Sequence, residues 1–294
     1  MTANHSHTES IVQTARELVN RLRSYGPVAV TFSGGVDSAV VAKAAVEAWG
    51  ERSVAVTAVS PSLARSELEI ARSEAQLIGI RHVELRTDEF DRPEYRRNAG
   101  DRCFFCKDTL YSLARSKLTE LQVGCIVNGA NTDDLGDYRP GMKAATDHDV
   151  RSPLIDEGIS KVTVRELAHY WKLTVAEKPA APCLASRIAY GVEVTEERVL
   201  RVERAEEFLR SLTGIDEFRV RCEASDLARI EVPLAVLSRL TEPAVREAIA
   251  MEFRELGFRR ITLDLEGFRS GSLNELLPIA LVPGCGAAAG GSRG

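Results

Sequence analysis

Short apolar runs alternate with segments of helical periodicity through the first half of the chain, and this order restricts the possible folds. In the helical segments, apolar residues recur every three or four positions, with charges on the opposite face. The expected elements are a helix over 11–22, a strand over 28–32, a helix over 39–49, a strand over 53–59, a helix over 68–78, a strand over 82–85, a helix over 104–121, a strand over 125–128, and a helix opened by a capping box at Thr163 and Glu166. Because strands joined through helices lie parallel, we predict an α/β fold: a parallel sheet with helices on both faces.

The order of elements changes from about residue 195. Thr195 is placed to cap a long helix that runs through Leu212. The expected elements after it are strands over 218–222 and 228–232, a helix over 243–256 and a strand over 260–265. This order predicts a second, smaller α+β domain. We place the boundary at Tyr190-Gly191, which gives domains over 1–190 and 191–283; residues 1–9 are expected to fray, and 284–294 to be disordered.

Composition excludes several classes of protein. Of the 294 residues, 44% are hydrophobic, which is enough to bury a core and excludes wholesale disorder. Lys and Arg number 38 against 43 Asp and Glu, a net charge of −5, so a nucleic-acid partner is not expected. No apolar run approaches the ~18 residues of a membrane span, and the polar N-terminus does not resemble a secretory signal. We therefore expect a cytoplasmic protein without a membrane partner.

The segment 33–38, with the sequence SGGVDS, lies between the first expected strand and the helix after it. At such a junction, free backbone N–H groups and the positive end of the helix dipole form an anion site. Two glycines let the backbone approach the anion closely. Asp37 suits this place if it holds a divalent cation, Mg²⁺ above all, that bridges phosphate oxygens. The alternative is an ordinary strand-to-helix turn, and neither the Walker pattern nor Gly-x-Gly-x-x-Gly follows this strand.

Six cysteines are too few for a disulfide scaffold in a chain of this length. Cys103 and Cys106 form a Cys-x-x-Cys pair, and Cys183 lies far along the sequence. Three others are predicted to be incidental, either packed as small apolar residues or free in the tail: Cys125, Cys222 and Cys285.

Arg219 and Arg221 lie two residues apart in an expected strand, so they share one face of the sheet. Two guanidinium groups on one face suit bidentate recognition of a phosphate. The alternative, which the strand alone favours, is a solvated outer face of an edge strand.

The segment 33–38 is similar to the phosphate loop of the ATP pyrophosphatases, called the PP-loop. Further motifs, taken in order, closely resemble the LarE family of ATP-dependent sulfur transferases, which act in the biosynthesis of the nickel-pincer nucleotide cofactor. These motifs are DRCFFCK at 101–107, NGANTDD at 128–134, DYRPG at 137–141, RSPL at 151–154, KPAAPCLASR at 178–187 and LDLEGFRSGS at 263–272. The resemblance covers about residues 10–280.

The resemblance implies a reaction. Members of this family activate a carboxylate of pyridinium-3,5-biscarboxylic acid mononucleotide with ATP, as an acyl-adenylate, and release pyrophosphate. A sulfur nucleophile then displaces AMP and leaves a thiocarboxylate. The sulfur-bearing cysteine of the family matches Cys183. In the sacrificial members this cysteine attacks the adenylate, and cleavage of its C–S bond leaves dehydroalanine after a single turnover.

The family also has a three-cysteine branch, whose pattern matches Cys103, Cys106 and Cys183. Three thiolates can hold three irons of a [4Fe–4S] cluster and leave the fourth iron open to a hydrosulfide. An external sulfur donor would then feed repeated turnover. Three other interpretations remain: a redox pair beside a sacrificial Cys183, half of a zinc site, although no second Cys-x-x-Cys or paired His appears, and plain buried cysteines.

The resemblance also assigns residues. It implies catalytic roles for Cys183, Lys107 and Asp37, with Lys107 orienting a phosphate or stabilising a thiolate. The ATP-binding residues expected from the loop are Ser33, Gly34, Gly35, Asp37 and Ser38. Asp134 is a further candidate, for a second metal or the ribose, and the alternative for it is a turn formed by the Asn/Asp cluster at 131–134. The implied ligands of the mononucleotide substrate are Arg187, Arg219, Arg221 and Arg269.

Other members of the superfamily remain as alternatives. A tRNA thiolase can combine the same loop with three cysteines, although the charge balance of −5 speaks against it. An amidating synthetase would not need Cys183, and an adenine-nucleotide sensor would bind ATP without releasing pyrophosphate. The family also implies a homo-oligomer.

Overall fold

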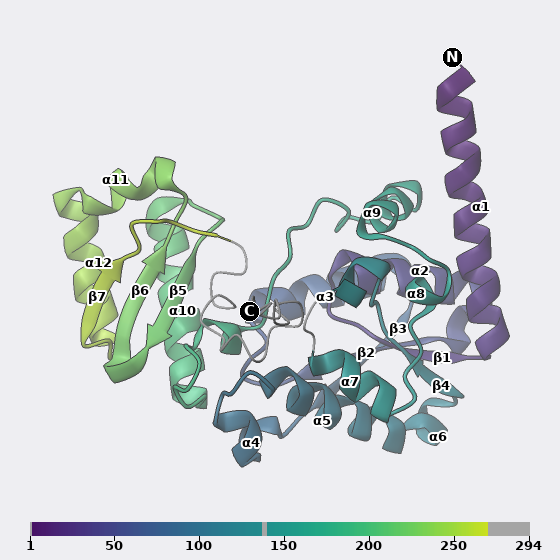
Figure 1. Cartoon of the computed structure of the whole chain (residues 1–294), viewed down its shortest axis with the longest axis horizontal. Helices are drawn as coiled ribbons and strands as arrows, with labels where there is room; N and C mark the ends of the chain where they lie inside the picture. Colours follow the sequence, from purple (N-terminus) through teal and green to yellow (C-terminus); the bar gives the residue numbers. More distant parts are fainter. Residues whose placement is uncertain (1, 137–139, 270–294) are drawn as a thin grey trace, which may run out of the picture.

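The computed structural model describes residues 2–136 and 140–269, and these form two lobes (Figure 1). The first lobe holds a four-stranded sheet between layers of helices, and the second holds a three-stranded sheet. The predicted α/β class with a smaller C-terminal α+β part is confirmed. Residues 137–139 and 270–294, which include part of the DYRPG motif, the end of the last motif, Cys285 and the expected tail, lie outside the described residues.

All four strands of the first sheet are parallel, in the order β3-β2-β1-β4. Their bounds are β1 Val28–Thr31, β2 Val54–Val59, β3 Arg81–Arg86 and β4 Cys125–Val127. The chain builds outward from β1 to β3 and then returns to place β4 on the other side of β1. The strand order therefore reverses between β1 and β4, and in open α/β sheets ligands bind at such a point, beyond the carboxyl ends of the strands.

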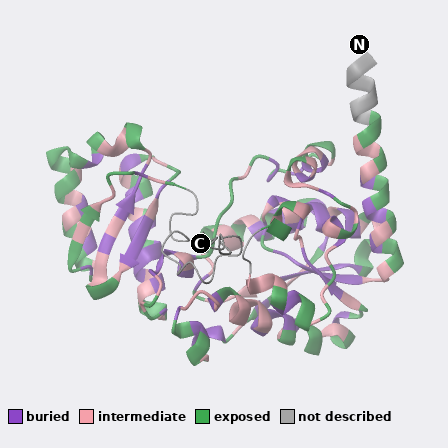
Figure 2. Ribbon diagram, viewed as in Figure 1, coloured by how far each residue is buried: buried purple, intermediate pink, exposed green. Residues whose placement is uncertain are grey.

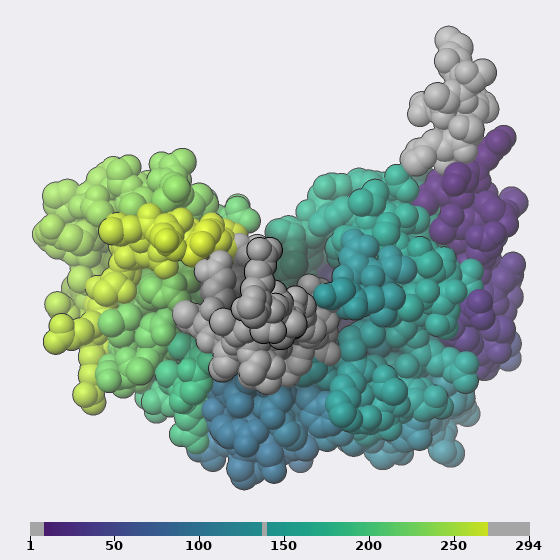
Figure 3. Space-filling view, viewed as in Figure 1, coloured from purple at the N-terminus to yellow at the C-terminus, as the bar shows by residue number. Residues whose placement is uncertain are grey.

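Helices cover both faces of this sheet. Side chains alternate between the two faces along each strand, and the apolar residues on each face pack against a different set of helices. Val28 and Val30 enter one core with the first set of helices, whereas Ala29 enters another core with the second set. The first set is α1 Thr2–Tyr25, α2 Val36–Trp49, α3 Arg65–Ile78 and α9 Lys161–Tyr170; the second is α5 Arg102–Ser116, α6 Leu118–Leu121 and α7 Pro140–Asp147. Helix α1 lies along the outer edge of the lobe (Figure 3).

The second lobe follows the predicted αββαβ order. Its elements are α10 Glu196–Thr213, β5 Arg219–Glu223, β6 Leu227–Glu231, α11 Leu237–Thr241, α12 Pro243–Glu255 and β7 Arg260–Leu263. Strands β5 and β6 are antiparallel, and β7 lies parallel to β6. Strands β5 and β6 are largely buried, whereas the outer helices are exposed on their solvent side (Figure 2).

Short elements complete the fold. The short α-helices are α4 Pro93–Arg96 and α8 Pro153–Asp156. The 3₁₀ helices are Gly50–Arg52, Glu89–Asp91, Thr132–Gly136, Leu184–Arg187, Ala224–Asp226 and Leu234–Val236. No helix among the described residues combines the length and the apolar content needed to cross a membrane.

Three expectations about helix ends are wrong. Residues 2–9 continue α1 instead of fraying, since neither Gly nor Pro interrupts the segment. The single helix expected over 104–121 divides into α5 and α6 at Lys117. Helix α9 begins three residues earlier than the capping box implied, because the Ser160 side chain accepts a hydrogen bond from the Thr163 N–H. The cap predicted at Thr195 is confirmed, with its side chain bonded to the Arg198 N–H.

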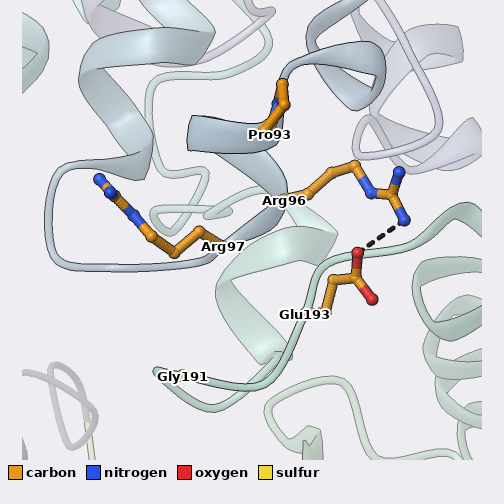
Figure 4. A pocket seen from close by; sticks show the side chains of 5 residues that line it. All are labelled: Pro93, Arg96, Arg97, Gly191 and Glu193. Atoms are coloured by element: carbon orange, nitrogen blue, oxygen red, sulfur yellow. Dashed lines mark ion pairs between the residues drawn. The ribbon is translucent and has the colours of Figure 1, made fainter.

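The two lobes meet along the segment around the proposed boundary at Tyr190-Gly191. Asn98 is fully buried, with a φ of 54°, and its Nδ2 donates to the backbone oxygens of Ile188, Ala189 and Val192. A shallow pocket beside this junction is lined by Pro93, Arg96, Arg97, Gly191 and Glu193 (Figure 4). There Arg96 pairs with Glu193 at 2.6 Å, while Arg97 points away from it.

One face of the second sheet is charged although it is partly buried. In register, Arg219 lies opposite Glu231 and Arg221 lies opposite Arg229. Glu231 is fully buried and accepts from both Nε and Nη2 of Arg221, at 3.0 and 2.9 Å, and from Arg229 at 2.7 Å. The opposite face is apolar, with Val220, Cys222, Ala228 and Ile230 in the core against α10 and α12.

Glu231→Gln tests how much the buried pair of Glu231 and Arg221 contributes to the stability of the fold. Removing this charge takes away the buried carboxylate that Arg221 holds through both Nε and Nη2, so we expect a loss of about 3 kcal/mol in the free energy of unfolding, measured by urea denaturation. Glu247→Gln, in an exposed ion pair with Arg246, serves as the matched control and should cost less than about 0.5 kcal/mol. Equal losses in the two variants would contradict this assignment.

Candidate active site

The segment 33–38 forms a tight loop between β1 and α2, as predicted. Gly34 has a φ of 69°, and a Cβ there would lie 2.8 Å from the Ala71 Cα, so only glycine fits. The Ser38 hydroxyl donates to the Gly35 carbonyl at 2.9 Å and accepts from the Ser33 N–H at 3.3 Å. In the described part of the chain no side chain caps α2. Its first N–H groups therefore remain available to an anion.

The loop after β4 packs directly on this phosphate loop, at the point where the strand order reverses. A Cβ at Gly129 would lie 2.8 Å from the Ser38 N, so these two backbones are in close contact. Asn131 Nδ2 donates to Asp37 Oδ1 at 3.0 Å. The Asp134 carboxylate accepts the Asn131 N–H at 3.0 Å, so it shapes its own loop and reaches the phosphate loop through Asn131.

Two lysines flank the phosphate loop. Lys161 Nζ lies 2.5 Å from Asp37 Oδ2, and Lys178 Nζ lies 2.6 Å from Glu67 Oε2 and 3.3 Å from the Gly34 oxygen. The sequence reasoning did not single out either side chain. For Lys161 the sequence did hold a clue. It is the first residue of α9, where the helix dipole disfavours a positive charge, so a lysine at this position suggests a role other than stabilising the helix.

Cys183 is exposed and begins a turn that leads into the 3₁₀ helix over 184–187. The Leu184 N–H donates to the Ser62 oxygen at 2.8 Å, which fastens this turn just beyond the carboxyl end of β2. Strand β2 is the neighbour of β1, which carries the phosphate loop. The Cys183 thiol and the anion site thus lie at the same edge of the sheet.

Arg187 and Arg221, both predicted to bind substrate, hold this turn. Arg187 is buried and donates to the Pro182 oxygen, to the Cys183 oxygen at 3.1 Å and to Glu206 at 3.2 Å. Arg221 donates to the Ser186 oxygen at 3.0 Å in addition to its pairing with Glu231.

Cys103 and Cys106 lie three residues apart in the first turns of α5, so they share one face of the helix. Cys103 is exposed, yet the protein around it displaces enough water to raise the pKa of its thiol, while Arg102 and Lys107 oppose the rise. Burial and the nearby Glu89 raise the pKa of Cys106 to about 12. Cys183 contributes to both shifts, so the three predicted thiols lie within electrostatic range of one another.

Lys107 is half-buried beside these cysteines. Its loss of solvent works to lower its pKa, but attraction to Tyr111 and to the three thiols outweighs that effect and raises it. Lys107 is therefore a cation that faces the thiols.

Arg219 and Arg269 differ in their surroundings. The Arg219 guanidinium lies 4.9 Å from the centre of the Phe268 ring. Burial lowers its pKa, and repulsion from Arg187 and Arg221 adds to the shift. Among the described residues no carboxylate lies within ion-pair distance of Arg219, whereas Arg269 pairs with Glu266 at the surface.

The chain resembles known proteins over most of its length. The asparagine synthase family model matches residues 13–99, which include the phosphate loop. An uncharacterized protein of Synechocystis sp. is 44% identical over 84% of this chain and 92% of its own length. The pyridinium-3,5-bisthiocarboxylic acid mononucleotide synthase of Lactiplantibacillus plantarum is 34% identical over 88% of this chain and 93% of its own length. An uncharacterized protein of Methanocaldococcus jannaschii is 26% identical over 83% and 91%.

Gly129→Ala tests the contact between the two loops. The added methyl group must displace the Ser38 backbone, so we expect ATP to bind about ten-fold more weakly, measured by titration calorimetry. Gly136→Ala, in the same loop region but with open space around its Cβ position, should bind ATP as the unmodified chain does. Unchanged affinity in a folded Gly129→Ala variant would show that the contact does not shape the site.

Proposed function

The chain belongs to the LarE family of PP-loop ATP pyrophosphatases, and on that basis we propose that it is an ATP-dependent sulfur transferase. Its substrate is pyridinium-3,5-biscarboxylic acid mononucleotide, and it converts a carboxylate of this molecule to a thiocarboxylate. The observation that carries the proposal is the position of Cys183. Its turn is fastened beyond β2, beside the phosphate loop that follows β1, so a thiol and an anion site serve the same edge of the sheet.

The first step needs a site for MgATP. A substrate carboxylate oxygen attacks the α-phosphorus, the bond to the β-phosphate breaks, and pyrophosphate leaves with the electron pair. The free N–H groups of α2 and the hydroxyls of Ser33 and Ser38 suit the pyrophosphate portion. Lys161 and Lys178 add positive charge on either side of the loop. Asp37 supplies carboxylate oxygens for the Mg²⁺ that ATP carries, once Lys161 turns to a phosphate.

Arg219 is the best candidate for the phosphate of the mononucleotide. Arg187 and Arg221 repel it, and a bound dianion would relieve that repulsion. Both of those arginines already have carboxylate partners, Glu206 and Glu231, and backbone oxygens of the Cys183 turn. We therefore assign direct phosphate binding to Arg219 and a supporting role to the other two.

The second step delivers sulfur. A sulfur nucleophile attacks the carbonyl carbon of the acyl-adenylate, and AMP leaves from it. We propose that Cys103, Cys106 and Cys183 hold a [4Fe–4S] cluster, which would supply a bound hydrosulfide from an external donor as that nucleophile. Three thiols in electrostatic range, two of them one helical turn apart, fit this donor set. Among the described residues no three His, Cys, Asp or Glu side chains lie close enough together to hold a metal ion, so cluster binding would require these thiols to lose their protons and move closer to one another.

The alternative is sacrifice of Cys183, and its exposed thiol suits direct attack on the adenylate. Attack gives a thioester with loss of AMP. Removal of the cysteine Cα proton then forms the Cα=Cβ bond, the Cβ–S bond breaks toward sulfur, and the product thiocarboxylate leaves dehydroalanine behind.

Cys183→Ala separates the two steps. The adenylylation site does not include this thiol, so we expect the variant to release pyrophosphate with the mononucleotide and ATP but to form no thiocarboxylate, measured by a phosphate assay and mass spectrometry. Cys125→Ala, at the half-buried start of β4, is the matched control and should form product normally. Product from a folded Cys183→Ala variant supplied with ammonia would instead indicate an amidating synthetase.

The double variant Cys103→Ser, Cys106→Ser distinguishes the two sulfur routes. With a cluster, the unmodified chain purified without oxygen should contain iron and sulfide and turn over repeatedly when sulfide is supplied, and the double variant should form no product. If Cys183 is sacrificed, the double variant should form one product per chain, and the Cys183 peptide should lose the elements of hydrogen sulfide in its mass spectrum. That second result would overturn the cluster.

A further inference from the structure

Arg102 opens α5, directly before Cys103, and its side chain reaches the other cysteine element. Its Nη1 donates to the Ala185 oxygen at 2.8 Å and to the Asn98 side-chain oxygen. Ala185 lies two residues beyond Cys183, in the short helix that its turn leads into. One guanidinium therefore links the helix that carries Cys103 and Cys106 to the turn that carries Cys183.

Burying the Arg102 side chain at this position is unfavourable in free energy, so a compensating role is expected. Arg102 is only 6% exposed, and burying a charge without a counter-charge is unfavourable. The two oxygens named above are neutral, and no carboxylate in the described ranges forms an ion pair with Arg102. A positive charge at the first residue of a helix also opposes the helix dipole. An apolar residue would serve packing alone at lower cost.

The contacts of Arg102 supply that reason. It lies next to Cys103 in the sequence, and its guanidinium donates to Ala185, two residues beyond Cys183, so it joins the two elements that carry these thiols. Asn98, the second acceptor of the Arg102 guanidinium, is held rigidly. It is fully buried, and its side chain donates to three backbone oxygens in residues 188–192.

We propose that Arg102 is a positioning residue, which holds the Cys183 turn against the first turn of α5 and so sets the separation of Cys183 from Cys103 and Cys106. Resting on the proposed role of Cys183 as the reacting sulfur, this inference adds a residue whose task is to bring the three sulfurs together. Arg187, at the end of the turn, and Arg221, in β5, hold the same turn through the Cys183 and Ser186 oxygens, whereas Arg102 holds it from α5.

The test measures how near the thiols are, without ATP or substrate. The reduced, metal-free chain is treated with dibromobimane, which joins two neighbouring thiols, and peptide mass spectrometry measures the fraction of Cys183 joined to the α5 peptide. We expect Arg102→Ala to lower this fraction about ten-fold, since small displacements strongly reduce the effective concentration of neighbouring groups. Added guanidinium ion should fill the vacated space and restore most of the cross-link, which loss of general stability would not allow.

Arg97→Ala is the matched control. Arg97 lies five residues earlier, 58% exposed, in a surface pair with Asp101, and its removal should change the cross-link by less than about two-fold. A folded Arg102→Ala variant that cross-links like the unmodified chain, or that guanidinium does not rescue, overturns the proposal.

If Arg102→Ala does not fold, Arg102→Lys decides. Lysine keeps the charge, but its side chain is shorter and its ammonium cannot reach the place of Nη1, which donates to both Ala185 and Asn98, so a folded variant should cross-link about three-fold less. Full cross-linking in that variant would overturn the proposal. Because no reaction is followed, failure of the sulfur-transfer proposal would leave this result intact, and the reverse also holds.

Discussion

Three buried guanidinium groups hold the backbone oxygens of the turn around Cys183, and the arrangement of the site depends on them. Arg102 comes from the first lobe, Arg187 from the turn itself and Arg221 from β5. The turn is not part of a long helix or a sheet, so its carbonyl groups need other donors. Each arginine is fixed on its far side, by Asn98, Glu206 or Glu231. An exposed thiol is thereby carried on a rigid support.

The parallel sheet brings the remaining parts of the site together. Because β4 lies on the side of β1 opposite β2, the loops after β1 and β4 come together at the point where the strand order reverses, and Gly129 contacts Ser38 there. The Cys183 turn approaches from the other side, through Ser62 beyond β2. Distant segments converge because the carboxyl ends of parallel strands share one edge.

The sequence predicted the elements well and their pairings poorly. Strands β1, β2 and β4 follow from short apolar runs, the other strands from apolar residues set between charged or polar ones, and the phosphate loop from its glycines between a strand and a helix. The contacts of Arg221 could not be predicted in the same way, because its partner Glu231 lies diagonally across on β6, and that register is set by a turn at Ser225 and Asp226 with positive φ. The pairing of Asp37 with Lys161 joins residues 124 positions apart in the chain. No local pattern encodes such a contact.

That pairing has a consequence for how the phosphate loop meets a polyphosphate. Asp37 with Lys161, and Glu67 with Lys178, make the rim of the loop nearly neutral before any ligand arrives. When a polyphosphate binds, each lysine would leave its carboxylate partner and pair with a phosphate oxygen, so the total number of ion pairs would change little. Binding of this kind depends on the fit of the exchanged contacts more than on long-range attraction, so it would vary less with ionic strength than capture by an unpaired basic surface.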